Sequence, residues 1–353
     1  MRVAVDGMGG DYAPEEVVAG AAAAARTLGI EILLVGPRDR LEPLVRSQGP
    51  GLPLTVVDAP EVIEMSEAPA MALRRKRRAS VVVTLEQVRD GRADAAVSAG
   101  NTGAAMGAAL LTLGRIPGID RPAIAAILPT AQKTPVILLD VGANVDCKPK
   151  HLLQFALMGS VYARRVLGVS TPRVGLLSNG EEATKGNDLT IRTAELLRAS
   201  GLHFVGNVEG RDFFTGQADV VVCDGFVGNV VLKFGEGLAL ALRQLLRDEL
   251  RGTPGRLLAL YLAPLKRRGM ALWRKLDYRE YGGAPLLGVN GVVIIAHGRS
   301  NAWAIRNAIR VAADAAARRV VEPIAAEMAA LEARTSVLAG AAETPSAGVG
   351  EGP

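Results

Sequence analysis

The chain has 353 residues, enough for one large α/β domain or two smaller ones, and only 4% of them are aromatic. Its two cysteines exclude a disulfide framework and a C-x-x-C metal site, so we expect a cytoplasmic protein. The net charge of +5 is concentrated in residues 74–78 and 265–269, which predicts an acidic protein partner or an anionic membrane surface and no nucleic acid. We expect no signal peptide, and residues 95–114 are too polar for a membrane span.

Short apolar runs alternate with helical patterns along the whole chain. The runs predict strands at residues 3–6, 31–35, 54–58, 95–98, 123–128, 136–140, 174–178, 203–206, 220–224 and 292–296. The patterns between them predict helices that include residues 15–27, 80–90, 101–113, 151–167 and 187–199. This alternation indicates an α/β fold of three α/β/α layers, in which helices cover both faces of a largely parallel sheet.

Two regions depart from this alternation. Residues 236–283 contain no predicted strand and read as a helical excursion from the main body. Residues 336–353 are rich in alanine, glycine, threonine, proline and serine, which predicts a disordered tail. We therefore predict a single catalytic α/β domain over residues 1–335, followed by that tail.

The turns that follow the predicted strands are the expected ligand sites of a parallel sheet. The first, VDGMGGDYAP, matches G-x-G at Gly7 and Gly9 but has Tyr12 at the third glycine position, which disfavours dinucleotide binding. The stretch SNGEEATKGND, residues 178–188, lacks the Gly-Lys-Ser/Thr order of a P-loop. Lys185 within it is either an anion-binding cation or a solvated loop lysine.

Two further turns resemble each other: SAGNTGAAMG at residues 98–107 and DGFVGNVVLKFG at residues 224–235. Each has small residues and an asparagine where a helix begins, which suits either anion binding by backbone N–H groups or an ordinary asparagine cap. Their occurrence together favours an anion. The turns at 140–149 and 294–302 add Asn144, Asp146 and His297 at other strand ends.

Metal and thiol chemistry are both disfavoured by spacing. Asp6, Asp11, Asp140, Asp146 and Asp224 do not form a tight ligand set, so we expect them to cap turns and helices, and we expect no metal and no cofactor. We do not expect either cysteine, Cys147 or Cys223, to be a nucleophile, since a catalytic thiolate needs an adjacent base, although the fold could bring a histidine to one of them.

Six motifs occur in a fixed order over residues 1–312: VDGMGGDYAP, RRKRRASVVVTLEQVRDGRADAAVSAGNTGA, LLDVGANVDCKP, LLSNGEEATKGN, DGFVGNVVLK and GGAPLLGVNGVVIIAHGRSNA. Together they resemble the bacterial acyl-acyl-carrier-protein:phosphate acyltransferases of phospholipid synthesis. One departure is Ala79, where relatives often carry a polar residue. The resemblance implies a fold like that of phosphotransacetylases and isopropylmalate-type dehydrogenases, and a homodimer. It also implies that orthophosphate and an acyl carrier protein are the substrate and partner, and that the acyl phosphate product passes to a membrane glycerol-3-phosphate acyltransferase.

Phosphate can itself attack the thioester, so such an enzyme has to hold phosphate and stabilise an oxyanion rather than supply a nucleophile. On this basis we expect Asn101, Thr102 and Gly103 to bind phosphate. Lys185 would supply counter-charge, Asn229 would donate a hydrogen bond, and His297 would either protonate the leaving sulfur or serve a structural role. The remaining pocket candidates are Asp6, Gly9, Gly10, Asn144, Asp146, Asp224 and Gly228.

We also expect two surface segments to bind partners. The basic run formed by Arg74, Arg75, Lys76, Arg77 and Arg78 suits an acidic carrier protein or is a solvated helix end. The segment 256–278 combines basic residues with apolar ones and suits a membrane surface, a dimer contact or a core-packed helix pair; its apolar candidates are Leu258, Leu262, Leu265 and Trp273. The alternatives for function are a short-chain phosphotransacetylase that uses acyl-CoA, a nicotinamide-dependent dehydrogenase and a non-catalytic scaffold.

Overall fold

The computed structural model describes residues 1–132, 134–249, 280 and 282–342. The strands are β1 (Arg2–Asp6), β2 (Glu31–Gly36), β3 (Leu54–Asp58), β4 (Ala95–Ser98), β5 (Ala123–Leu128), β6 (Val136–Leu139), β7 (Val174–Leu177), β8 (Phe204–Val208), β9 (Val220–Val222), β10 (Ala284–Leu287) and β11 (Val292–Ile295). The helices are α1 (Glu15–Leu28), α2 (Arg38–Ser47), α3 (Pro69–Arg75), α4 (Ser80–Arg89), α5 (Thr102–Thr112), α6 (Pro149–Tyr162), α7 (Asp188–Ala199), α8 (Gly225–Glu249), α12 (Ala302–Ala317) and α13 (Val321–Ala342). A π-helical turn, Ala163–Leu167, extends α6, and a 3-10 turn spans Gly210–Phe214.

One sheet of eleven strands runs through the molecule in the order β3-β2-β1-β4-β11-β10-β5-β6-β9-β7-β8. The strands from β3 to β11 are parallel to one another, and so are those from β6 to β8. The three pairings between these halves, β11–β10, β10–β5 and β5–β6, are all antiparallel. Because three reversals separate them, β11 and β6 run in opposite directions, so the two halves of the sheet end at opposite edges.

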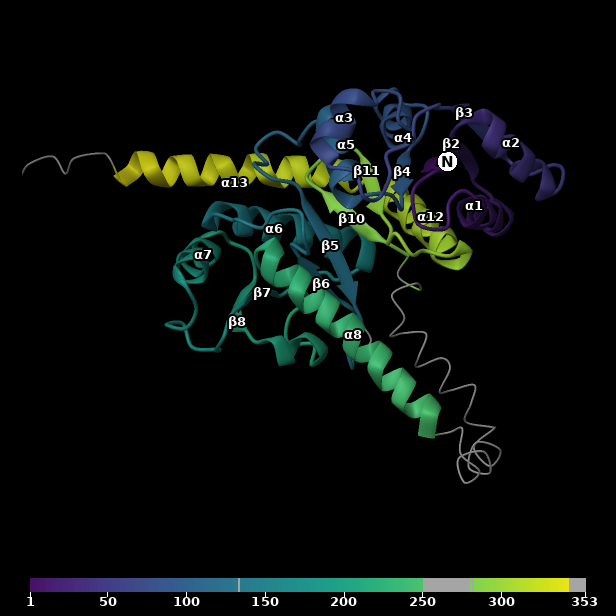
Figure 1. Ribbon diagram of the computed structural model, residues 1–353. Coiled ribbons are helices and arrows are strands. Elements are labelled where there is room, and N and C mark those ends of the chain that lie inside the picture. Colours follow the sequence, from purple (N-terminus) through teal and green to yellow (C-terminus); the bar gives the residue numbers. More distant parts are fainter. Residues whose placement is uncertain (133, 250–279, 281, 343–353) are drawn as a thin grey trace, which may run out of the picture.

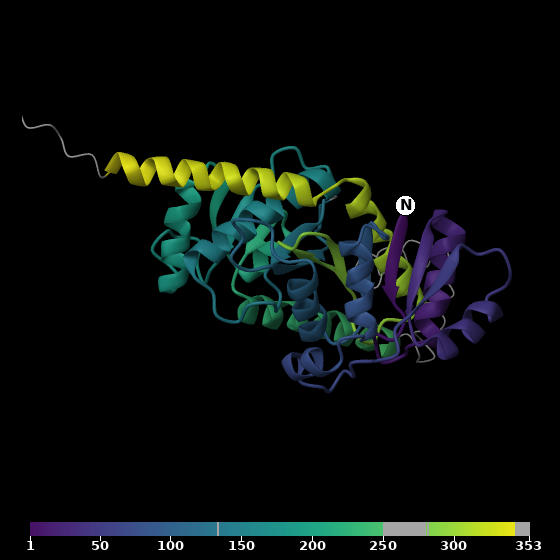
Figure 2. The ribbon, with the colours of Figure 1, turned by 90° about the horizontal axis from the view of Figure 1, so that it is seen from above.

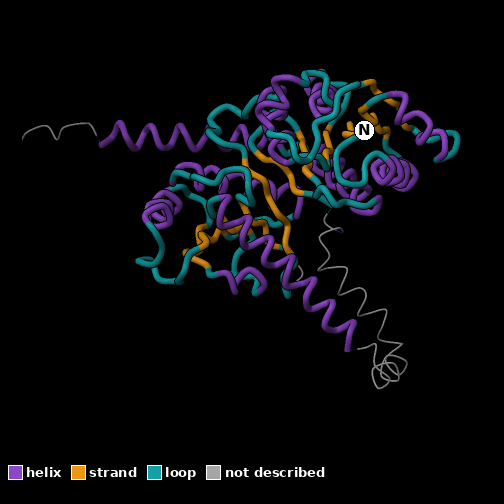
Figure 3. The backbone as a smooth tube through the Cα atoms, viewed as in Figure 1, coloured by secondary structure: helices purple, strands orange, loops and turns teal. Residues whose placement is uncertain are grey.

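The two faces of the sheet pack into separate cores because side chains alternate along each strand. In β4, Ala95 and Val97 face one core and Ala96 faces the other. The first core is shared with α1, α6, α12 and α13, and the second with α4 and α5. Helices therefore cover both faces, and Figures 1 and 3 show the strands running between them. This confirms the predicted α/β/α layers and the largely parallel sheet.

Two helices project beyond the layered body. Figure 1 shows α8 running away from the half of the sheet that contains β6 to β8. Figure 2 shows the distal part of α13 extending beyond the layered body. Residue 236, near which the helical excursion is predicted to begin, lies within the continuous helix α8. Helix α13 continues to Ala342, so it includes residues 336–342 of the predicted tail. Residues 343–353 and 250–279 lie outside the described part of the chain.

The predicted strands match the observed ones to within a few residues, and β3, β4 and β5 match in full. The strand that the sequence reading missed is β10, APLL, which has only four residues and contains Pro285. It is also the strand that introduces the reversal of direction, so missing it hid the separation of the two sheet edges.

Candidate active site

The turn after β1 is braced by the buried carboxyl group of Asp6. Its Oδ2 accepts a hydrogen bond from the hydroxyl of Ser98 at 2.7 Å, and its Oδ1 accepts one from the N–H of Met8 at 3.2 Å. Burial raises the pKa of Asp6 above its usual value, although hydrogen bonds from Ser80 and Ser98 counter this shift. Asp6 therefore acts as a support beneath the site, and sequence reasoning missed Ser98, its link to the next strand.

The turns after β1, β4 and β11 lie against one another, as neighbouring parallel strands should allow. A Cβ on Gly9 would approach the nitrogen of Gly100 to 2.6 Å, so only glycine fits there. The N–H of Asp11 donates to the carbonyl oxygen of Gly298 at 2.7 Å, and Gly10 (φ +114°) lies beside that same carbonyl. The structure thus brings together Asp6, Gly9 and Gly10 with the predicted phosphate turn and the turn that bears His297.

The turn after β4 ends in the asparagine cap of α5. The Asn101 Oδ1 accepts a hydrogen bond from the N–H of Ala104 at 3.1 Å, and its Nδ2 donates to the carbonyl oxygens of Met65 and Glu67 at 2.9 and 3.2 Å. Its side chain is therefore fully committed to structure. In contrast, no hydrogen bond within the described chain engages the N–H groups of Thr102 and Gly103. These two donors are available to an anion at the helix N-terminus.

His297 is exposed on the turn that follows β11. Its Nδ1 accepts a hydrogen bond from the N–H of Arg299 at 3.1 Å. A neutral imidazole that accepts at Nδ1 carries its proton on Nε2. This tautomer makes Nε2 a donor, which is the protonation state that a leaving thiolate or an oxyanion requires.

A second group of candidates lies at the end of β6, on the other half of the sheet. Asp140 is fully buried, and its carboxylate accepts hydrogen bonds from the N–H groups of Ile124, Ala143 and Asn144 at 3.0, 3.1 and 2.6 Å. Burial raises its pKa, with these hydrogen bonds acting in the opposite direction. The side-chain amide of Asn144 donates to Asp140 and to the carbonyl oxygen of Pro122, so it too is committed to structure.

The N-terminus of α8 packs directly on this group. Asp224 caps the helix by accepting from the N–H of Val227 at 2.9 Å. A Cβ on Gly228 would come within 1.9 Å of the carbonyl oxygen of Asp140. Asn229, one residue further on, lies beside Gly142, and no hydrogen bond of the described residues engages its amide. Asp146 is exposed nearby on the same turn.

Lys185 is exposed in the loop between β7 and α7. Asn207 on β8 holds this loop by donating from its side-chain amide to the carbonyl oxygen of Glu182 at 3.0 Å. The contacts among described residues gather the candidates into two groups, one with Asn101 and His297 and one with Asn144 and Asn229. They do not join Lys185 to either group. Because β10 and β5 reverse the direction of the sheet, the turns that follow its strands lie at two edges.

The cysteines are poorly suited to nucleophilic chemistry. Burial raises the pKa of Cys147 to about 12, and it raises that of Cys223 well above its usual value. Neither thiol forms appreciable thiolate at neutral pH, which agrees with the expectation that no enzyme nucleophile is used.

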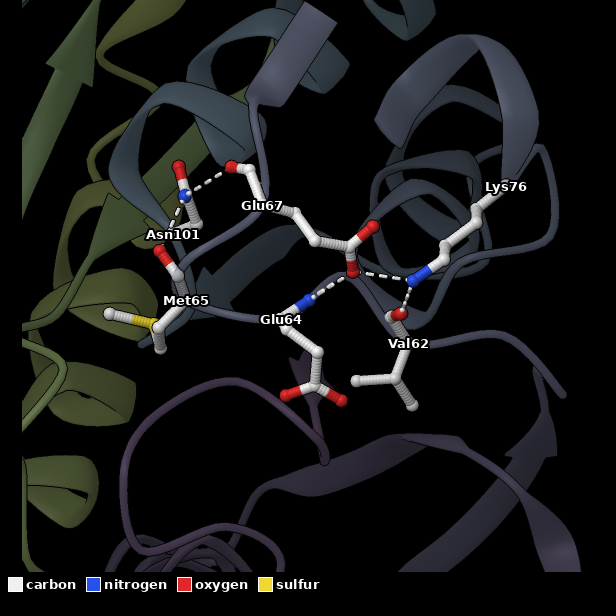
Figure 4. Close-up of polar contacts among 6 residues, drawn as sticks. All are labelled: Val62, Glu64, Met65, Glu67, Lys76 and Asn101. Carbon is white, nitrogen blue, oxygen red and sulfur yellow. Dashed lines mark hydrogen bonds and ion pairs between the residues drawn. The ribbon is translucent and has the colours of Figure 1, made fainter. Parts of the chain in front are cut away.

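The basic run beside α3 is divided by the structure. Arg74, Arg75, Arg77 and Arg78 are exposed. Lys76 instead has an internal role, since its ammonium donates to Glu67 Oε1 at 2.5 Å and to the carbonyl oxygen of Val62 at 2.6 Å (Figure 4). Lys76 is therefore half-buried in an ion pair with Glu67, whereas the other four side chains of the run are exposed. The membrane candidates Leu258, Leu262, Leu265 and Trp273 lie outside the described residues.

Known proteins resemble this chain in both sequence and fold. Residues 1–323 match the family described as "Fatty acid synthesis protein". A phosphate acyltransferase of Pelotomaculum thermopropionicum is 54% identical over 95% of this chain and 97% of its own. A phosphate acyltransferase of Heliobacterium modesticaldum is 59% identical over 88% of this chain and 93% of its own.

The fold has solved counterparts with little sequence identity. A phosphotransacetylase from Streptococcus pyogenes covers 90% of this chain and 94% of its own with a TM-score of 0.62 at 18% identity. The EutD phosphotransacetylase of Staphylococcus aureus gives a TM-score of 0.58 at 14% identity. These structures establish the fold, and the sequence relatives establish the family. The chain belongs to the fatty acid synthesis protein family and, within it, to the phosphate acyltransferases.

Proposed function

We propose that the chain transfers a fatty acyl group from an acyl-carrier-protein thioester to orthophosphate, which is bound at the N-terminus of α5. The observation that carries this assignment is the pair of N–H groups of Thr102 and Gly103, which have no acceptor among the described residues. They sit where the helix dipole favours an anion. Asn101 shapes the turn, and the hydroxyl of exposed Thr102 adds a further donor.

The reaction then proceeds by direct attack. A phosphate oxygen forms a bond to the thioester carbonyl carbon, the C–S bond breaks, and the thiolate takes up a proton. A thiol with a pKa near ~8.5 is a good leaving group, so an oxyanion donor and a proton donor suffice. The Nε2–H of His297, on the turn beside the bound phosphate, is suited to either task. The raised pKa values of both cysteines argue against an acyl-enzyme.

Lys185 and Asn229 are proposed to act on the same phosphate, Lys185 as counter-charge and Asn229 as hydrogen-bond donor, although the described contacts place Asn229 in the second group and join Lys185 to neither group. The test is the Lys185→Ala variant, with phosphate saturation measured at a fixed acyl-carrier-protein concentration. We expect its phosphate KM to rise about tenfold, since a charge-assisted contact contributes about 1.5 kcal/mol. Lys150→Ala, which removes an exposed lysine paired with Asp120, is the matched control. An unchanged phosphate KM in Lys185→Ala would remove Lys185 from the site.

The four exposed arginines Arg74, Arg75, Arg77 and Arg78 are proposed to dock the acidic carrier protein. Substitution of Arg74 and Arg75 by glutamine should raise the KM for acyl-carrier protein and flatten its dependence on ionic strength. The phosphate KM should stay unchanged. A much higher rate with acyl-CoA than with acyl-carrier protein would instead favour a short-chain phosphotransacetylase.

We also propose that the protein is a cytoplasmic homodimer that associates transiently with the membrane and delivers acyl phosphate to a glycerol-3-phosphate acyltransferase. One stripe of α8 supports the dimer: Phe226, Val230, Phe234, Leu238 and Leu245 are exposed at nearly helical spacing. A second copy of this chain would bury that stripe. A Phe234→Asp variant that remains dimeric in analytical ultracentrifugation would contradict this.

A further inference from the structure

Residues 59–79, the segment between β3 and α4, lie beside the N-terminus of α5. Figure 4 shows its polar contacts, which centre on the carboxylate of Glu67. Its Oε1 accepts hydrogen bonds from the N–H of Glu64 at 2.8 Å and from the ammonium of Lys76 at 2.5 Å. Lys76 also donates to the carbonyl oxygen of Val62 at 2.6 Å, so the segment 62–67 is closed on itself and attached to the end of α3.

The same segment is also hydrogen-bonded to the N-terminus of α5. The amide of Asn101 donates to the carbonyl oxygens of Met65 and Glu67 while its oxygen caps α5. Helix α3 packs closely there as well, because a Cβ on Gly103 would lie 2.8 Å from Cγ of Pro69. The side chain of Met65 reaches the β11 turn, where a Cβ on Gly298 would lie 2.7 Å from its Cε. The segment between β3 and α4 therefore contacts both the N-terminus of α5 and the turn that bears His297.

From these contacts we infer that Glu67 and Lys76 are positioning residues, which hold the N-terminal turn of α5 in place through Asn101. Because Asn101 bonds to the backbone of Met65 and Glu67, any shift of this segment moves the cap of α5. The Glu67–Lys76 pair prevents that shift by tying the segment to α3. The N–H of Glu64, and after it the ammonium of Lys76, lowers the pKa of Glu67, so its carboxylate remains an acceptor for both at neutral pH.

The effect of the Glu67–Lys76 pair on the reaction rests on the proposed phosphate site. If phosphate binds to the N–H groups of Thr102 and Gly103, the pair sets the geometry of those donors without touching phosphate. Lys76 then affects phosphate binding, whereas its exposed neighbours Arg74 and Arg75 affect carrier binding. A run of basic residues in the sequence is thereby divided into two roles by the partner that Glu67 supplies.

The first test measures, by amide hydrogen exchange in the full-length protein, how firmly the Glu67–Lys76 pair holds the N-terminal turn of α5. In Glu67→Ala and Lys76→Met, the amides of Ala104 and Ala105, which bond to Asn101, should exchange about threefold to tenfold faster than in the unmodified chain. Lys76→Arg, which keeps N–H donors for Glu67 and Val62, should restore slow exchange. The matched control is Glu42→Gln, which loosens an ion-pair group on α2 with Arg38 and Arg46. Unchanged exchange in both single variants overturns the inference.

The second test uses steady-state kinetics on the same variants. Glu67→Ala and Lys76→Met should each raise the phosphate KM about twofold to fivefold and leave the ionic-strength dependence of the carrier KM unchanged. The double variant should resemble either single one, because both residues belong to one contact. A carrier KM that loses its salt dependence in Lys76→Met, with exchange unchanged, would make Lys76 a docking residue and overturn the inference. Faster exchange with an unchanged phosphate KM would support the positioning role of Glu67 and Lys76 and refute the proposed phosphate site.

Discussion

The hydrogen bonds at Asp140 predict a large and specific loss of stability when its carboxylate is removed. In Asp140→Ala, the N–H groups of Ile124, Ala143 and Asn144 lose their acceptor, while the amide of Asn144 keeps Pro122. Leaving a buried donor unpaired costs about 1–2 kcal/mol, with the lower value for the half-buried turn. The cost is about 4 kcal/mol in all, from which we subtract about 1 kcal/mol because the variant no longer buries a carboxylate whose pKa is raised.

We therefore expect Asp140→Ala to lower the free energy of unfolding by about 3 kcal/mol, a large part of the roughly 5–15 kcal/mol that a domain has. Asp140→Asn keeps one acceptor oxygen in place and should lose only about half as much. Urea denaturation at neutral pH, followed by circular dichroism and intrinsic fluorescence, measures both variants against the unmodified chain. A loss below about 1 kcal/mol in Asp140→Ala, or an equal loss in Asp140→Asn, would refute the reasoning.

Contacts at Gly228, His151 and Cys147 give measurable effects of substitution or pH. Gly228→Ala places a methyl group against the Asp140 carbonyl and should destabilise the fold by about 1–3 kcal/mol. Gly237→Ala, in open space on the same helix, should instead stabilise it by about 0.5–1 kcal/mol. Denaturation midpoints compare the two variants, and equal effects would contradict the packing at Gly228. Burial lowers the pKa of His151, which accepts the Lys148 N–H at Nδ1, so its contribution to stability is present above its usual pKa of 6.5 and is lost as the pH falls through the lowered value. Thermal melts below pH 6.5 should therefore show a smaller loss for His151→Asn than for the unmodified chain, and parallel curves would exclude His151. Because burial raises the pKa of Cys147 to about 12, Cys147→Ala should retain full turnover and iodoacetamide should leave activity unchanged at neutral pH, whereas rapid inactivation would show a reactive thiolate.

Much of the fold could be read from local pattern. The alternation of apolar runs placed β4 and β5 correctly, and the asparagine caps of α5 and α12 follow motifs visible in the sequence. The direction of the strands could not be read, because it depends on pairings between segments as distant as Leu286 and Ile124. The sequence therefore supplied the turns but not their division between two sheet edges.

The candidate site was readable to a similar degree. Gly9 and Asn101 stand in turns that local rules recognise, and the structure brings their turns together. The role of Lys76 was not readable, because its four basic neighbours gave a uniform appearance and its partner Glu67 lies in a separate segment. Asp140 was equally ambiguous, since its hydrogen-bond donors come from β5 as well as from its own turn.

The central claim is that orthophosphate itself attacks the thioester, and a rapid-quench experiment in the absence of phosphate tests it most directly. Enzyme is mixed with a stoichiometric amount of radiolabelled acyl-carrier protein, and both free carrier thiol and protein-bound acyl label are measured. Addition of phosphate follows, with hydroxylamine trapping of the acyl phosphate. We predict no thiol release and no labelled enzyme until phosphate is added, and then equal amounts of thiol and trapped acyl group. A burst of thiol with acyl label on the enzyme before phosphate is added would contradict the mechanism.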